Sequence, residues 1–113
     1  MRVDVKPLSV NEAWQGRRYK TEKYKSYEYA MLYTLPHINI PQGDLRITFE
    51  FGFSNKSSDL DNPVKPFLDI LQKRYGFNDS RVYEIVIRKK IVKTGSEYID
   101  FDIQKHDQEH TLI

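Results

Sequence analysis

The sequence of 113 residues contains no cysteine, so disulfide bonds, thiolate metal ligands and a cysteine nucleophile are all excluded. A cytoplasmic location is therefore the expectation. No apolar run approaches the roughly 20 residues that cross a membrane, and residues 1–6 lack the apolar segment of a secretory signal. Repeats, low-complexity blocks and long linkers are also missing. The sequence thus predicts one domain and no membrane partner.

A strong excess of one charge is missing as well, because 18 lysines and arginines are balanced by 16 aspartates and glutamates. With 39% hydrophobic and 30% charged residues, this composition is typical of a globular protein and does not by itself indicate nucleic-acid binding. The distribution is more informative, since basic residues crowd residues 17–25 and 89–93, apart from the main acidic segment. This pattern suits an enzyme that holds phosphates and a divalent metal, although ordinary solvated faces would produce it too.

Hydrophobic spacing predicts two helices. The first covers residues 21–35 and stops at Pro36, which disfavours a helical residue before it. The second covers residues 63–75, with Asn62 as N-cap and Gly76 after its last turn. The side chains expected to be buried on these helices are Tyr24, Tyr27, Met31, Leu35, Val64, Phe67, Leu68 and Leu71.

Alternating apolar residues predict strands, of which residues 45–53 are the clearest because every second side chain is large and apolar. Strands are also expected at residues 3–5, 82–92 and 98–104, and the last two would form an antiparallel hairpin. The fold class is therefore α+β, a small mixed sheet with two helices packed on it. The remaining expectations are an irregular segment at residues 9–18, a domain that covers residues 1–105 and a flexible polar tail at residues 106–113.

The most informative segment is acidic and lies just before the second helix. Asp59 and Asp61 share one side if the chain there is extended, and two such carboxylates repel each other unless a cation joins them. Oxygen ligands of this kind suit Mg²⁺ or Mn²⁺. Lys65 falls in the first helical turn, where the helix dipole opposes a cation, so a role near a phosphate would explain it. Asp79, in the loop after the helix, is the next acidic candidate.

Ordinary structural roles would also account for these residues. The two aspartates before the helix would then serve as caps, and Asp79 would belong to a simple turn. Lys65 and Asp69, four residues apart, would form a surface ion pair.

A family resemblance is carried by residues 59–71 (Asp-Leu-Asp-Asn-Pro-Val-Lys-Pro-Phe-Leu-Asp-Ile-Leu), residues 76–82 (Gly-Phe-Asn-Asp-Ser-Arg-Val) and the following basic strand, residues 87–90 (Ile-Arg-Lys-Lys). These segments resemble the core of the RusA family of Holliday junction resolvases. A weaker similarity covers residues 10–27, so the resemblance extends over most of the chain. The Asp-Leu-Asp-Asn motif with its lysine and trailing aspartate is its most specific part. Asn78 stands where the family usually has the first of two consecutive aspartates, whereas the second, Asp79, is retained.

The resemblance implies an endonuclease that requires Mg²⁺ or Mn²⁺ and acts on four-way DNA junctions as a homodimer. By position, it implies that Asp59, Asp61 and Asp79 bind the metal and that Lys65 is the essential basic residue. A metal-activated water would hydrolyse the phosphodiester. The candidates for holding the flanking phosphates are Arg17, Arg18, Lys20, Lys23, Lys89 and Lys90. The alternatives are a nuclease for flaps or forks, a module that binds junctions without cutting them, and a purely structural protein.

Other residues carry weaker hypotheses. His106 and His110 have the spacing of zinc ligands on a helix but no third ligand nearby, so a zinc site is not expected. The tyrosines at positions 19, 24, 27 and 33 would either stack on unpaired bases or pack in the core or a dimer interface. Trp14 would anchor a dimer or cover the core.

Overall fold

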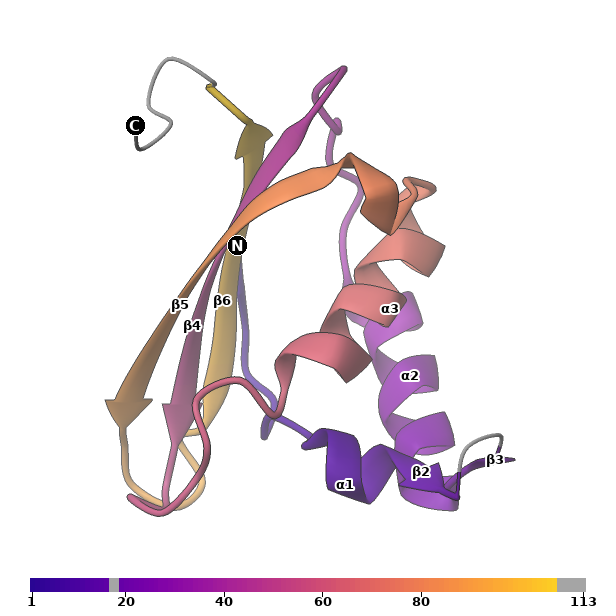
Figure 1. The fold of residues 1–113 in the computed structure, drawn as a ribbon. Helices are drawn as coiled ribbons and strands as arrows, with labels where there is room; N and C mark the ends of the chain where they lie inside the picture. Colours follow the sequence, from indigo (N-terminus) through magenta and orange to yellow (C-terminus); the bar gives the residue numbers. More distant parts are fainter. Residues whose placement is uncertain (17–18, 108–113) are drawn as a thin grey trace.

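A four-stranded sheet, covered by helices on one face, forms the framework of the protein (Figure 1). The computed structural model describes residues 1–16 and 19–107. The sheet contains β1 (Arg2–Val3), β4 (Leu45–Phe53), β5 (Val82–Ile91) and β6 (Tyr98–Lys105). The helices are α1 (Val10–Ala13), α2 (Glu22–Thr34) and α3 (Val64–Tyr75), and a short ribbon pairs β2 (Trp14–Gln15) with β3 (Tyr19–Lys20). The predicted α+β class with a small mixed sheet is confirmed, with three α-helices in the described residues instead of two.

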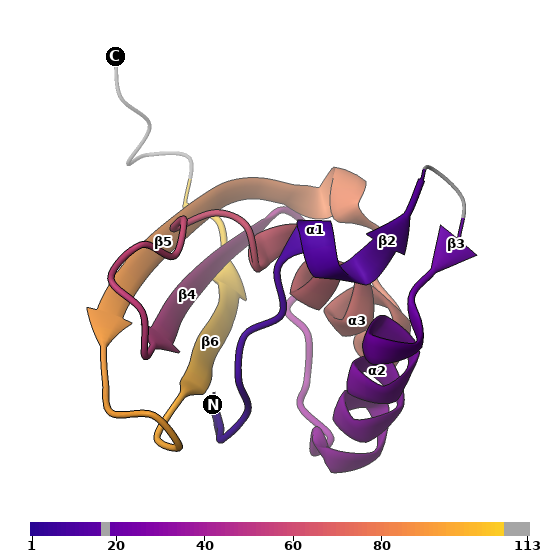
Figure 2. The ribbon, with the colours of Figure 1, turned by 90° about the horizontal axis from the view of Figure 1, so that it is seen from below.

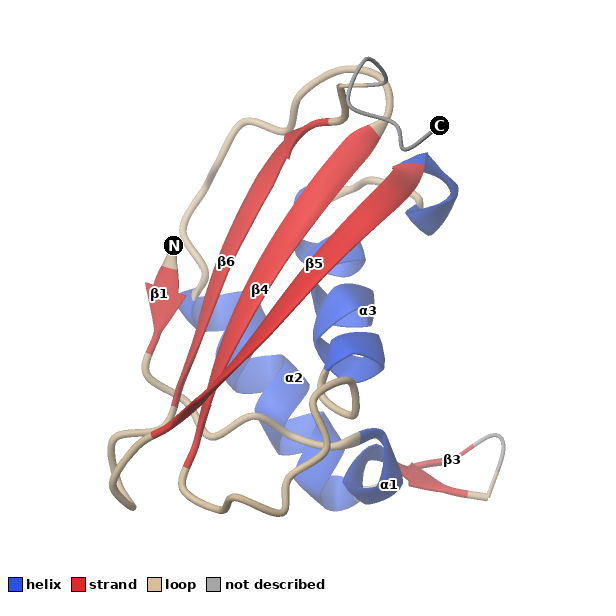
Figure 3. Cartoon of the chain, turned by 60° about the vertical axis from the view of Figure 1, so that its left-hand side comes forward, coloured by secondary structure: helices blue, strands red, loops and turns tan. Residues whose placement is uncertain are grey.

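The strand order is β1-β6-β4-β5, so the apolar strand β4 lies inside the sheet (Figure 3). It pairs with β5 in parallel and with β6 in antiparallel orientation. The predicted hairpin of the last two strands is therefore wrong, because β4 lies between them. Five large apolar side chains along β4 make a central place the most favourable one, and α3 provides the crossover that a parallel β4–β5 pair needs.

The core lies between the sheet and the helices, where the aromatic rings of β4 meet α3. Phe49 packs edge-on against Phe67 of α3 at a centroid distance of 6.1 Å, and Phe67 packs in the same way against Phe101 of β6 at 5.5 Å. Leu45, Ile47, Phe49 and Phe51 are fully buried, as their alternation predicted. Most of the buried helix residues were also predicted correctly: Tyr24, Tyr27, Met31, Leu35, Phe67 and Leu71.

Some of the predicted helix ends are confirmed and others are wrong. Thr21 caps α2 by accepting a hydrogen bond from the backbone N–H of Tyr24, and Gly76 ends α3 in the left-handed conformation with a φ of 71°. The expected Asn62 cap is wrong, because α3 begins at Val64 after Pro63 and has no side-chain cap. Helix α1 was expected to be irregular, yet Ser9 and Glu12 form a reciprocal capping box around its single turn.

Contacts with the rest of the protein continue to His106, the first residue of the polar C-terminal segment. The backbone N–H of His106 donates to the carbonyl of Asp44 at 2.8 Å, and the ring of His106 lies 5.8 Å from that of Tyr83. Residues 108–113, which include His110, lie outside the described residues. In the described part of the chain no helix combines the length and the apolar character that crossing a membrane would need.

Candidate active site

The acidic loop, residues 54–62, connects the end of β4 to the start of α3 and carries Asp59 and Asp61. Both side chains are exposed. The side-chain amide of Asn62 donates to the Asp59 carboxylate at 3.2 Å, and the carbonyl of Asp61 accepts the N–H of Val64 at 3.0 Å. Asp61 is thereby fixed by its backbone at the N-terminal end of α3, with its carboxylate open to solvent.

Two neighbouring elements hold the acidic loop in place. The Lys89 ammonium, from β5, donates to the carbonyls of Lys56 at 2.8 Å and of Ser58 at 2.5 Å. On the other side, the N–H of Val10 at the start of α1 donates to the carbonyl of Asn62 at 2.9 Å. Figure 2 shows the loop running from the end of β4 past β5 towards α1 and the start of α3. The loop that carries the carboxylates is therefore anchored at both ends.

Two depressions have predicted site residues in their walls. Asp59 lines a cavity of about 260 Å³, whose other polar walls include Lys6, Glu12 and Glu97. Lys65 lines an open groove of about 630 Å³ together with Asp69 and Trp14. Trp14 packs edge-on against the buried Tyr24 at 5.7 Å, so its ring forms a wall between the core and the groove. Of the predicted catalytic residues, Asp59 and Lys65 thus line surfaces where a ligand can approach.

Lys65 forms the surface ion pair with Asp69 that their four-residue spacing predicted. Its ammonium lies 3.3 Å from the Asp69 carboxylate, and its side chain is 63% exposed. Asp69 also accepts a bond of 3.4 Å from the amide of Gln72, and the Gln72 oxygen accepts the backbone N–H of Asp79 at 3.0 Å. A row of side chains therefore runs along α3 from Lys65 to the turn that contains Asp79.

Asp79 lies at the opposite end of α3 from Asp61. The helix has twelve residues and spans about 18 Å at 1.5 Å per residue. Figure 1 shows the acidic loop and the turn before β5 at the two ends of this helix. Across residues 1–16 and 19–107, no three histidine or acidic side chains gather in a way that could hold a metal ion. One chain alone therefore brings Asp59 and Asp61 into one loop but leaves Asp79 apart.

The side chain of Asn78 has a structural role in the turn around Asp79. The Asn78 side-chain oxygen accepts the N–H of Ser80 at 2.8 Å and so caps the short 3-10 turn Asp79–Arg81. An asparagine makes this bond as an aspartate would. Asp79 itself is exposed.

Most of the expected DNA-contacting lysines already have protein partners. Lys20 lies 3.0 Å from Glu28, Lys23 pairs with Glu12, and Lys89 is bonded to the acidic loop. The hydrogen bond from Lys23 lowers the pKa of Glu12. Lys90 is exposed and forms no ion pair with another described residue. Arg17 and Arg18 lie outside the described residues.

The sequence did not indicate Glu28 as an organising residue, although it joins three elements. Its carboxylate lies 3.0 Å from Lys20 of β3 and 3.1 Å from Lys73 of α3. Burial alone would raise the pKa of Glu28, but the hydrogen bonds from these two lysines outweigh it and lower that pKa. The partners lie far apart along the chain, so no spacing rule could have found the cluster.

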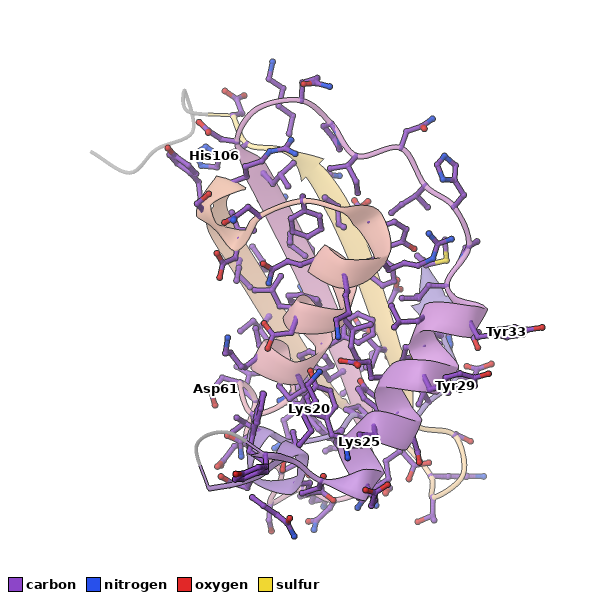
Figure 4. All side chains as sticks on the ribbon, turned by 90° about the vertical axis from the view of Figure 1, so that its right-hand side faces the viewer. Lys20, Lys25, Tyr29, Tyr33, Asp61 and His106 are labelled. Atoms are coloured by element: carbon purple, nitrogen blue, oxygen red, sulfur yellow. The ribbon has the colours of Figure 1, made fainter. Side chains whose placement is uncertain are left out.

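The tyrosines divide into two groups. Tyr24 and Tyr27 are buried, and the Tyr24 hydroxyl donates to the carbonyl of Pro66 at 3.3 Å. Tyr19 and Tyr33 are 72% and 86% exposed. Figure 4 shows Tyr33 and Tyr29 projecting from α2 at the right of the view, whereas Asp61 lies at the left. Core packing explains the first group, and the second remains available for contacts with a ligand or partner.

Residues 5–100 match the family described as Endodeoxyribonuclease RusA. The match includes the acidic loop, α3 and the turn with Asp79, and it assigns the protein to the nucleases that cut within a DNA strand. The chain belongs to the RusA family, which makes it a junction-resolving endonuclease. No curated protein matches the sequence.

Proposed function

We propose that the protein resolves four-way DNA junctions by metal-dependent hydrolysis, with one nick in each of two symmetrically placed strands. The observation that carries this proposal is the position of Asp59 and Asp61. Both are exposed on a loop that β5 and α1 anchor, within the segment that matches the family.

The side chains present suit a hard divalent cation. Asp59 and Asp61 offer carboxylate oxygens and are exposed, so water can reach both, and the hydrogen-bond partner of Asp59 is the neutral amide of Asn62. Mg²⁺ and Mn²⁺ bind through one or two carboxylates and keep several waters. When bound, the ion would activate a water for attack on phosphorus and neutralise charge on the phosphate. Asp79 is the third carboxylate that the family pattern proposes.

The chain's own residues would position the scissile phosphate. Lys65 lies in the first turn of α3, on an open groove that it lines with Asp69, and Asp69 orients its ammonium. A phosphate near this end of α3 would meet the positive end of the helix dipole. Lys65 would then stabilise the negative charge that grows during attack.

Binding of the flanking DNA would rest on phosphate contacts. Lys90 is the described candidate with a free ammonium, while Lys20, Lys23 and Lys89 would have to exchange their protein partners for phosphates. Arg17 and Arg18 remain proposals from the sequence. A homodimer would present two sites related by a twofold axis, as paired nicks in a symmetric junction require.

The test is cleavage of a synthetic four-way junction with and without Mg²⁺ or Mn²⁺. Native protein should make paired nicks only with metal, and Asp61→Asn should make none. Asp102→Asn is the matched control, because Asp102 is an exposed aspartate on β6, away from the loop. Binding without nicking would instead identify a binding module, and faster cutting of flaps or forks would change the substrate. Nicking by Asp61→Asn at the native rate would refute the site.

A further inference from the structure

The open groove beside Lys65 differs in chemistry from the acidic loop. Its volume of about 630 Å³ falls within the range of sites that bind small molecules. The groove is lined by Val10, Asn11, Trp14, Gly16, Lys65 and Asp69. An aromatic ring and a cation therefore border the same depression. Proteins that bind single-stranded nucleic acid use this combination, in which the ring takes the face of a base and the cation takes the phosphate.

The ring of Trp14 is held in place although the residue is only half-buried. It packs edge-on against the buried Tyr24, with 5.7 Å between the ring centroids and 68° between the ring planes. The backbone of Trp14 pairs with Lys20 in the β2–β3 ribbon. Just before it, the carbonyl of Ala13 accepts the N–H of Thr21 at 2.9 Å. A ring fixed in this way loses little conformational entropy when a ligand stacks on it.

Tyr24 also connects Trp14 to the segment that carries Lys65. Its ring contacts Trp14, and its hydroxyl donates to the carbonyl of Pro66, the residue after Lys65, at 3.3 Å. Helix α1, which ends directly before Trp14, lies against α3 (Figure 2). The two walls of the groove are therefore attached to each other. The ring of Trp14 and the backbone of Lys65 keep a fixed relation.

Two hydrogen-bonding groups on the groove are available to a ligand. The side-chain amide of Asn11 and the indole N–H of Trp14 form no hydrogen bond with another residue that the structure describes. Asn11 is also exposed. The amide offers both a donor and an acceptor, and the indole offers a donor, so the two can contact the polar edge of a base.

We propose that this groove binds an unpaired nucleobase at the branch point of the DNA, with the base stacked on Trp14 and an adjoining phosphate at Lys65. The inference deepens the proposed function and rests on it for the place of the scissile phosphate. In an unbranched duplex every base is paired and stacked on both faces, so none can reach the ring without leaving the helix. At a branch point the stacking is interrupted, so a base leaves its pair at a lower cost. The groove would thus select branched DNA through one base beside the cut.

The fluorescence of Trp14 tests the stacking without any need for nicking. Trp14 is the single tryptophan of the chain, so emission excited beyond the absorption of tyrosine reports this ring alone. A four-way junction, added without metal so that no strand is cut, should quench most of the emission. An unbranched duplex with the sequence of two arms should leave it nearly unchanged when bound. Equal quenching by the bound duplex would overturn the proposal, because the ring would then touch DNA without selecting an unpaired base.

Junctions that lack a single base connect the stacking to the reaction. One abasic junction lacks the base on the 5′ side of the cut, and a second lacks the base on the 3′ side. One of the two should be nicked about tenfold more slowly by the native protein, as the loss of one base–aromatic contact predicts. Trp14→Leu should slow nicking of the intact junction by a similar factor. On the abasic junction it should cause no further loss, since the contact is already missing.

Trp14→Phe is the matched control for Trp14→Leu. Both side chains keep an apolar group against Tyr24, but only phenylalanine keeps a face for stacking, so Trp14→Phe should nick the intact junction at nearly the native rate. If the losses from Trp14→Leu and the abasic site multiply, the two act independently and the base does not lie on Trp14. Native nicking rates on both abasic junctions would contradict the proposal even if Trp14→Leu did not fold.

The outcomes also separate this inference from the proposed function. A native protein that nicks junctions with metal while the junction leaves Trp14 unquenched would refute the base site alone. Emission that changes with protein concentration in the absence of DNA would refute it too, because a second copy would then cover the ring. Quenching by the junction without nicking under any metal would leave the base site standing and refute the proposed function instead.

Discussion

Replacing Lys89 by methionine separates two roles that this residue could have, which are DNA contact and support of the active site. Its ammonium donates to two loop carbonyls, at 2.8 and 2.5 Å. Hydrogen bonds to a charged group contribute about 1.5–3 kcal/mol when buried, but Lys89 is exposed, so we expect a loss of about 1 kcal/mol in the free energy of unfolding. Because the loop carries Asp59 and Asp61, the main effect should be on the rate of nicking.

Lys90→Met is the matched control, since its neighbouring ammonium has no protein partner among the described residues. Junction affinity should be measured against salt concentration for both variants, together with single-turnover nicking. Loss of one phosphate contact reduces the salt slope by about 0.9. We expect that reduction for Lys90→Met with a nearly native nicking rate, and for Lys89→Met a native slope with a rate at least about tenfold lower. A reduced slope and a native rate for Lys89→Met would refute the supporting role.

Three further results are expected. Asp61→Asn should leave the metal-free protein as stable as the native one or more so, because it removes repulsion within the loop, and millimolar Mg²⁺ should raise the melting temperature of the native protein only. Glu28→Gln should lower the free energy of unfolding by about 1–2 kcal/mol at pH 7, measured by urea denaturation. Since the folded-state pKa of Glu28 is lowered, its contribution is present above the ordinary value of 4.5 and is lost as the pH falls through the folded-state pKa, so the two proteins should converge in acid. Gly52→Ala should destabilise the protein by about 1–3 kcal/mol, because its new methyl would overlap the ring of Tyr98, and Tyr98→Ala should relieve part of that loss.

The elements that the sequence predicted correctly are those whose signal is local. In β4 every second residue is large and apolar, and in α2 and α3 the buried residues recur at helical spacing between a capping threonine or proline and a terminating residue. These patterns depend only on which side of an element meets the core. Helix α1 was missed because one turn gives too short a repeat, although Ser9 and Glu12 have the spacing of a capping box.

The errors concern relations between distant segments. Adjacency along the chain favoured pairing β5 with β6, but nothing local to either strand shows that β4 lies between them. The same limit applies to the site. Asp59 and Asp61 are close in sequence and so lie in one loop, whereas the position of Asp79 depends on the length and direction of α3. Helix α3 spans about 18 Å and separates Asp61 from Asp79, so no local pattern in the sequence shows whether these two residues bind the same ion.

The central claim, that the acidic loop holds the catalytic cation, is tested most directly by counting bound Mn²⁺ with electron paramagnetic resonance. Native protein and Asp102→Asn should bind Mn²⁺ with equal affinity, and Mg²⁺ should displace it. Asp61→Asn should lose this binding while it keeps the native fold by circular dichroism. Native-like Mn²⁺ binding by Asp61→Asn would contradict the account, because the ion would then lie elsewhere on the protein.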